Sequence, residues 1–96
     1  MELIKELRGK ILFFLSYISP NSVNHQEVVS TLFEYHQVDD IEKALDYLCE
    51  KALVSRTETP HPFRKREKIV TYKILPKGTD IIDGTIEDPA IAVVEW

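Results

Sequence analysis

Several residue types and patterns are scarce in this 96-residue sequence, and each scarcity excludes a class of protein. The single cysteine, Cys49, excludes an internal disulfide and any Cys-x-x-Cys motif, and it is typical of a reducing compartment. No apolar run approaches the roughly 20 residues that a membrane-spanning helix needs. The first residues, MELIKELRGK, mix acids with bases and precede no small-residue cleavage site. We therefore expect no secretory signal and predict a cytoplasmic protein.

Motifs of catalysis and of cofactor binding are also missing. The sequence has no Ser/His/Asp grouping and no glycine-rich phosphate loop, and the acids near its end form no paired catalytic set. His25 and His36 are separated by about 16 Å along an expected helix that rises 1.5 Å per residue, so one ion cannot bind both. We predict a protein that is not an enzyme and that has no metal ion or cofactor. A metal site that combines His36 with Cys49 or Asp39 is the less favoured alternative.

The net charge of −4 conceals a strong segregation of charge along the chain. Residues 1–50 carry 4 basic and 9 acidic side chains, a balance of −5. Residues 51–77 carry 8 basic and 2 acidic side chains, a balance of +6, and residues 78–96 carry 5 acidic and no basic ones. A polyanion would therefore bind to the central block rather than to either flank.

Two helices are expected in the first third of the chain. Residues 2–18 have one apolar stripe and further apolar side chains beside it, which predicts either a central helix covered by several elements or a helix that contacts a second subunit. Asn24 and Glu27 form a capping-box pattern that predicts a second helix over residues 25–36. The side chains that this helix is expected to bury are Val28, Val29, Leu32 and Tyr35.

The chain is organised around a third expected helix with the sequence DDIEKALDYLCEKALV. Asp39 and Glu42 form a second capping box at its start. At 100° per residue, its apolar side chains gather on one face and its charged side chains on the other. The short link from the preceding helix predicts a helix-turn-helix.

The apolar period then changes from helical to alternating, which indicates strands. Residues 54–59 and 68–75 predict the two strands of a hairpin, and the prolines between them predict a loop. A short helix is expected from Pro76 to about Asp83, where Gly84 ends it.

The chain is expected to divide into one domain at residues 1–84 and a tail at residues 85–96. The tail contains the apolar run Ala90–Val94 and ends in Trp96. We expect it to fold back on its own domain or to cross to a second subunit, and a disordered end is the alternative.

The order of these elements and four sequence runs resemble a winged-helix domain. NSVNHQEVVSTL resembles the start of the second helix, and IEKALDYLCEKALVSR resembles the transition from recognition helix to wing. YKILPKGTDII is similar to the last wing strand and the following helix of MarR-, PadR- and ArsR-type regulators, with Pro76 where Thr is common. GTDIIDGTIEDPAI is similar to the tail of small winged-helix proteins of phages and prophages. The predicted fold class is α+β: a three-helix helix-turn-helix core, a two-stranded β-hairpin wing, a short C-terminal helix and a tail.

The resemblance implies DNA binding. In winged-helix regulators the third helix enters the major groove, and the wing tip contacts the backbone or the minor groove. The residues that would contact DNA in this chain are Lys43, Tyr47, Arg56, Arg64, Lys65, Arg66 and Lys68. Phe63, within the wing, is expected to pack beneath it, with stacking on a base or insertion into a groove as the alternative.

The acids of the third helix oppose this function. Glu42, Asp46 and Glu50 share the recognition face with a single lysine, and like charges would repel phosphates. The first hypothesis is therefore a small transcriptional regulator, acting as a homodimer through the first helix and the tail, that binds double-stranded DNA mainly through its wing. The alternative is a winged-helix module that binds another protein and no DNA.

Overall fold

The computed structural model describes residues 2–93 of the chain. Its elements, in chain order, are α1 (Glu2–Ile18), β1 (Val23–Asn24), α2 (His25–Leu32), α3 (Val38–Glu50), β2 (Val54–Pro60), β3 (Lys68–Ile74) and α4 (Pro76–Ile82). The three strands form one antiparallel sheet in the order β1-β3-β2. No helix within residues 2–93 combines the length and the apolar character that crossing a membrane requires.

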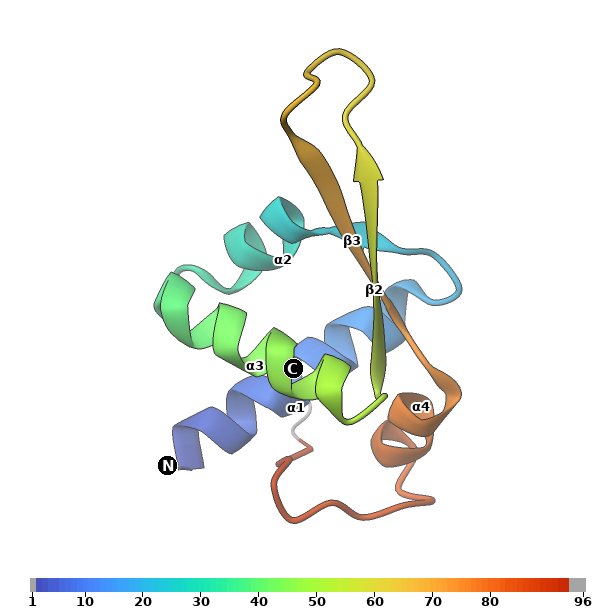
Figure 1. Ribbon diagram of the computed structural model, residues 1–96. Coiled ribbons are helices and arrows are strands. Elements are labelled where there is room, and N and C mark those ends of the chain that lie inside the picture. The colour runs from blue at the N-terminus through green and yellow to red at the C-terminus, as the bar shows by residue number, and fades with distance from the viewer. Residues whose placement is uncertain (1, 94–96) are drawn as a thin grey trace.

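α1 lies at the centre of the molecule and packs against α3, α4 and β3 (Figure 1). Its main apolar stripe is buried at Leu7, Ile11 and Leu15. Leu12, which lies off that stripe, is buried as well because α4 covers it: a Cβ atom built on Gly78 would lie 3.2 Å from Leu12 Cδ2. The expectation of a central helix covered by several elements is confirmed.

α2 begins where the sequence predicts and ends earlier. Asn24 Oδ1 accepts the backbone N–H of Glu27 at 2.8 Å, which confirms the N-cap. The helix stops at Leu32, and the N–H groups of Tyr35 and His36 both donate to the Leu32 carbonyl in a tight turn. This turn rotates the chain, so that His36 is buried and Tyr35 is 69% exposed. The expected burial of Tyr35 is therefore wrong.

α3 starts at Val38, and the predicted capping box at Asp39 is wrong. Gln37 holds the N-cap position without a side-chain bond, and its carbonyl accepts the N–H of Ile41. Asp39 and Asp40 lie within the first turn, where carboxylates interact favourably with the helix dipole. An acid is favoured both at the cap and just inside it, so the sequence pattern misplaced the start.

The end of α3 uses a left-handed residue that is not glycine. Ala52 has a φ of 59°, and the N–H of Leu53 donates to the carbonyl of Leu48 at 3.0 Å. This is the bonding of a Schellman motif, which usually has glycine at the left-handed position. It turns the chain sharply from α3 into β2.

β2 and β3 form the predicted hairpin, in register from Val54 opposite Ile74 to Pro60 opposite Lys68. Val54, Tyr72 and Ile74 are buried at its base, whereas the last five residues of β2 are exposed. The outer half of the hairpin and its loop therefore project from the body with no core beneath them (Figure 1).

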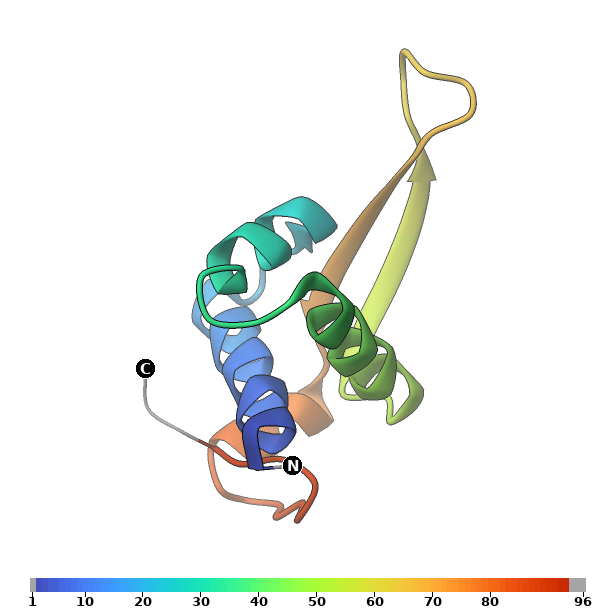
Figure 2. The same ribbon diagram turned by 90° about the vertical axis from the view of Figure 1, so that its left-hand side faces the viewer.

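The described part of the tail, residues 85–93, returns to the first turns of α1 (Figure 2). The N–H of Ala92 donates to the carbonyl of Lys5 at 3.0 Å, and Ile91 is buried. Only a glycine fits at position 9 of α1, beneath this part of the tail, because a Cβ atom on Gly9 would lie 1.8 Å from the Ala92 carbonyl oxygen. The last part of the expected apolar run and Trp96 lie outside the described residues.

Candidate nucleic-acid interface

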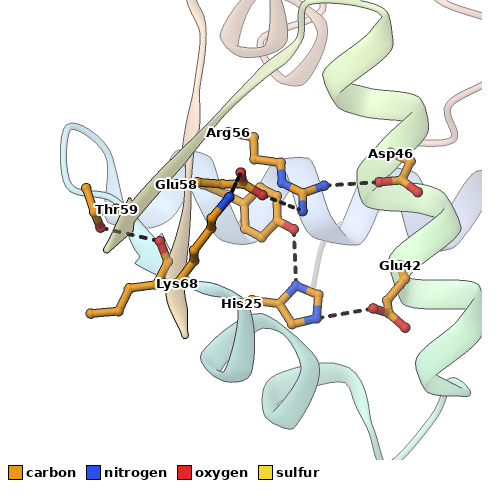
Figure 3. Close-up of polar contacts among 9 residues, drawn as sticks. His25, Glu42, Asp46, Arg56, Glu58, Thr59 and Lys68 are labelled. Carbon is orange, nitrogen blue, oxygen red and sulfur yellow. Dashed lines mark hydrogen bonds and ion pairs between the residues drawn. The ribbon is translucent and has the colours of Figure 1, made fainter. Parts of the chain in front are cut away.

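One side of the molecule brings together three elements: the start of α2, the outer face of α3 and the hairpin (Figure 3). The alternation of side chains along β2 turns Arg56 and Glu58 to the same side of the sheet. α3 presents Glu42 and Asp46 to this side, one helical turn apart. Charged side chains of both signs therefore meet on one face.

Arg56 links the hairpin to α3. Its Nη1 lies 3.6 Å from Asp46 Oδ1, and its Nη2 lies 3.3 Å from Glu58 Oε1. All three side chains are exposed, so solvent screens these pairs and each contributes at most about 1 kcal/mol to stability. Arg56, expected to contact DNA, thus already offsets the charge of an acid on the recognition face.

His25 makes a second link, from α2 to both α3 and the sheet. Its Nδ1 lies 3.1 Å from the Tyr72 hydroxyl, and its Nε2 lies 3.5 Å from Glu42 Oε2. Burial raises the pKa of Tyr72, so its hydroxyl stays protonated. The His25 ring can donate from one nitrogen and accept at the other, and its tautomer sets which of the two contacts it donates to.

The other two residues of α3 that were expected to contact DNA, Tyr47 and Lys43, have different surroundings. The ring of Tyr47 lies 3.7 Å from the Arg8 guanidinium carbon, in a cation–π contact with α1. Tyr47 is therefore turned away from Glu42 and Asp46, although the sequence places all three on one charged face. Lys43 is exposed on the outer side of α3.

The loop at the end of the hairpin is closed by its own hydrogen bonds. The N–H of His61 donates to the Glu67 carbonyl at 3.0 Å, and the N–H of Glu67 donates to the Arg64 carbonyl at 3.1 Å. His61 Nδ1 accepts the backbone N–H groups of Phe63 and Arg64, each at 3.1 Å. A seven-residue connection thus has a defined shape.

The basic side chains of this loop differ in their partners. Arg64 pairs with Glu67 at 3.2 Å, and Lys68 approaches Glu58 at 3.9 Å. The exposed Lys65 and Arg66 have no ion pair within residues 2–93, so their charge is not offset by a bonded acid.

Phe63 stands beside these cations and is 90% exposed. The expectation that it packs beneath the hairpin is wrong, because the outer half of the hairpin has no core for it to join. The loop instead presents an aromatic ring and the cations to solvent together.

Comparison with solved structures finds a similar chain, the reduced form of the transcriptional regulator YodB from B. subtilis. The TM-score is 0.67 at 20% sequence identity, over 86% of this chain and 74% of that one. The fold is a winged helix. The predicted fold class is thus confirmed, with the β2–β3 hairpin as the wing. Neither a family model nor a curated protein sequence matches the chain, and the finer similarity to MarR, PadR, ArsR or phage proteins stays a prediction.

The residues considered for metal binding have other contacts. His36 is 8% exposed, and its Nε2 lies 3.4 Å from Lys10 Nζ. Burial raises the pKa of the Cys49 thiol, with Arg56 opposing the shift. No three His, Cys, Asp or Glu side chains converge as metal ligands in the part of the chain that the structure describes.

Sequence reasoning missed two residues that shape this surface. No role was predicted for His25 once a metal ion shared with His36 was excluded, but His25 joins α2, α3 and the sheet. His61 was placed in a loop without a role, but it fixes the wing tip. The first contact depends on the pairing of β1 with β3, which places Val23 opposite Tyr72, so it leaves no spacing signal in the sequence. The second contact is local, but histidine is not among the residues whose side chains usually cap turns.

Proposed function

We propose that this chain is a regulator of transcription that binds double-stranded DNA mainly through its wing. The observation that carries the proposal is the pair of exposed cations at the wing tip, Lys65 and Arg66, whose charges no ion pair within residues 2–93 offsets. Such cations can neutralise phosphates without first losing an interaction inside the protein. The similar fold of YodB, named as a transcriptional regulator, supports the same function.

Within this proposal the wing residues act unequally. Lys65 and Arg66 contact phosphates directly, whereas Arg64 and Lys68 exchange an acid partner for a phosphate. An open groove of about 480 Å³ separates the wing from the start of α2, and Arg64 and Lys68 line its wing side. A phosphate backbone lying along this groove would meet both cations.

α3 contributes less to affinity than a basic recognition helix would. Lys43 is exposed and adds one cation, while Arg56 stays near Asp46 and reaches DNA only at the edge of the interface. Tyr47 is held by Arg8 and supports the helix from the side. The pairing of Asp46 with Arg56 reduces the repulsion that this acid exerts on phosphates.

The test is a titration of fluorescently labelled duplex DNA, followed by anisotropy at low and moderate salt. The unchanged protein is compared with a variant carrying Arg64→Glu, Lys65→Glu and Arg66→Glu. We expect salt-sensitive binding by the unchanged protein and its loss in the variant. Each phosphate contact contributes about 0.9 to the slope of log affinity against log salt, so the three side chains together should account for roughly three units of the slope of the unchanged protein.

A matched control carries the same change of charge elsewhere: Lys5→Glu, Lys51→Glu and Lys77→Glu, all exposed and outside the wing. It should lose much less affinity than the wing variant. Equal losses in both variants would show a response to net charge alone and would contradict a wing contact. Absence of binding by the unchanged protein, even at low salt, would favour a module that binds another protein.

We also propose that the protein acts as a homodimer through α1 and the tail. The tail is bonded beside the first turns of α1, where Ile4 and Val93 are 47% and 48% exposed. Exposed apolar side chains of this kind become buried in homodimer interfaces. Light scattering should give twice the chain mass of 11.1 kDa. Ile4→Asp should halve the measured mass. Tyr35→Asp, on the turn after α2, is the control and should leave the mass unchanged. A monomeric unchanged protein would contradict the proposal.

A further inference from the structure

Phe63 is the most exposed of the large apolar side chains in residues 2–93, and it lies at the tip of the wing. A single exposed apolar side chain has no significance by itself. Phe63 differs from the others because Arg64, Lys65 and Arg66 follow it directly and because its backbone is fixed.

The geometry of the tip holds Phe63 outward. His61 Nδ1 accepts the N–H of Phe63, and the two rings meet edge to face with centroids 6.2 Å apart. Pro60 and Pro62 fix their φ angles on either side of His61. A loop held in this way loses little conformational entropy when its ring enters a binding partner.

The charge around the ring identifies the kind of partner. Three cations follow Phe63, and within residues 2–93 only Arg64 forms an ion pair, with Glu67. An apolar tip within a cationic loop fits a polyanion whose interior is apolar and stacked, which describes a DNA duplex. Apolar side chains of DNA-bending proteins enter between base steps in this manner while neighbouring cations hold the phosphates.

We propose that Phe63 inserts as a wedge between stacked base pairs of the DNA that the wing contacts, and that His61 is the positioning residue that aims it. The inference rests on the proposed DNA binding. The preferred duplex has a pyrimidine–purine step, TA or CA/TG, at the wing contact, because these steps unstack most readily.

A topological assay tests the wedge without knowledge of the target sequence. Relaxed closed-circular plasmid is treated with topoisomerase I while saturated with protein, and its linking number is read on a gel after the protein is removed. An inserted ring unwinds the duplex, so the unchanged protein should leave the plasmid negatively supercoiled. Phe63→Ala should leave it relaxed at saturation and should weaken binding roughly five- to hundredfold, as the loss of one stacking contact does.

Three further variants complete the design. Phe33→Ala, which removes an exposed ring at the end of α2, should behave as the unchanged protein. His61→Ala should reduce the unwinding. His61→Asn should restore it, because an asparagine oxygen accepts backbone N–H groups of following residues in the same way.

The outcomes separate the wedge from DNA binding itself. If Phe63→Ala unwinds the plasmid as fully as the unchanged protein, the wedge is overturned, while the salt titration of the wing variant still decides the proposed function. If His61→Asn behaves like His61→Ala, the positioning part is overturned. If the unchanged protein does not bind DNA at low salt, both proposals fail together.

Discussion

Single residues in this chain carry strain and charge that its overall composition hides. Ala52 adopts a left-handed φ of 59°, and His36 is buried beside a lysine. Neither residue belongs to the interface. Substituting either residue should change the free energy of unfolding, for a reason that lies in the residue's own surroundings.

Replacing Ala52 by glycine should stabilise the protein. A left-handed conformation costs a residue with a Cβ atom about 1 kcal/mol, whereas glycine adopts it freely. We expect Ala52→Gly to raise the free energy of unfolding by about 0.5–1 kcal/mol in urea titrations. Ala44→Gly, within α3, is the control and should lower the free energy of unfolding. A decrease with Ala52→Gly would contradict the left-handed assignment.

His36 should make stability depend on pH. Burial and the nearby Lys10 lower the pKa of His36 below the 6.5 of an ordinary histidine, although Asp40 and Glu6 oppose the shift. Between the folded value and 6.5 the unfolded chain binds more protons, so this contribution is complete above pH 6.5 and is lost as the pH falls through the folded pKa. The slope of unfolding free energy against pH measures it.

Two variants check the origin of this slope. His36→Gln should reduce it, because the titrating group is gone. Lys10→Met should reduce it as well, because one cause of the lowered pKa is removed. A slope that stays unchanged in His36→Gln would assign the effect to other residues.

At the scale of elements, α3 and the wing are joined through opposite charges. Asp46 and Arg56 come from different elements, and both are exposed. The charge of Asp46, one of the acids that oppose DNA binding, is therefore partly offset in the fold. The DNA contact proposed above should therefore depend on the charge of α3 as well as on the wing.

Asp46→Asn should increase DNA affinity about two- to fivefold at low salt, because a negative charge is removed from the candidate interface while Arg56 keeps Glu58 as its acid partner. Anisotropy measures this change. Asp83→Asn, next to α4 at the end of the molecule opposite the wing, removes the same charge and should leave affinity nearly unchanged (Figure 1). Equal effects of the two substitutions would place α3 outside the interface.

At the scale of the whole molecule, the tail completes the body by returning to α1. Gly9 permits this contact, which joins residues more than 80 positions apart in the chain. In an ordinary helix interior, Gly→Ala stabilises by about 1 kcal/mol. Here the added methyl group would meet the Ala92 carbonyl oxygen.

Gly9→Ala should therefore destabilise the protein, by about 1–3 kcal/mol, as overpacking does. In a chain that ends at Pro89, the same substitution should be stabilising, because the three atoms nearest to the added methyl group belong to Ala92 and Val93 and are then absent. Chemical denaturation of the four chains measures the difference. A stabilising effect of Gly9→Ala in the full chain would contradict the tail contact.

The sequence by itself determined the order of elements, the hairpin and the segregation of charge. Such features depend on residues that are close together in the chain, so short-range sequence patterns predict them. Examples are the cap at Asn24, the change of apolar period after Leu53 and the basic wing. The start of α3 and the end of α2 were misplaced because acids and apolar residues fit either side of a helix boundary.

Only the tertiary structure decided what the interface residues contact. Arg56 meets Asp46 because strand register and helix orientation bring them together, and Phe63 stays exposed because no element lies beneath the wing tip. Tyr47 turns to Arg8 for the same kind of reason. Local sequence predicts which side chains share a face of their own element, but packing between elements decides which neighbouring side chain each of them contacts.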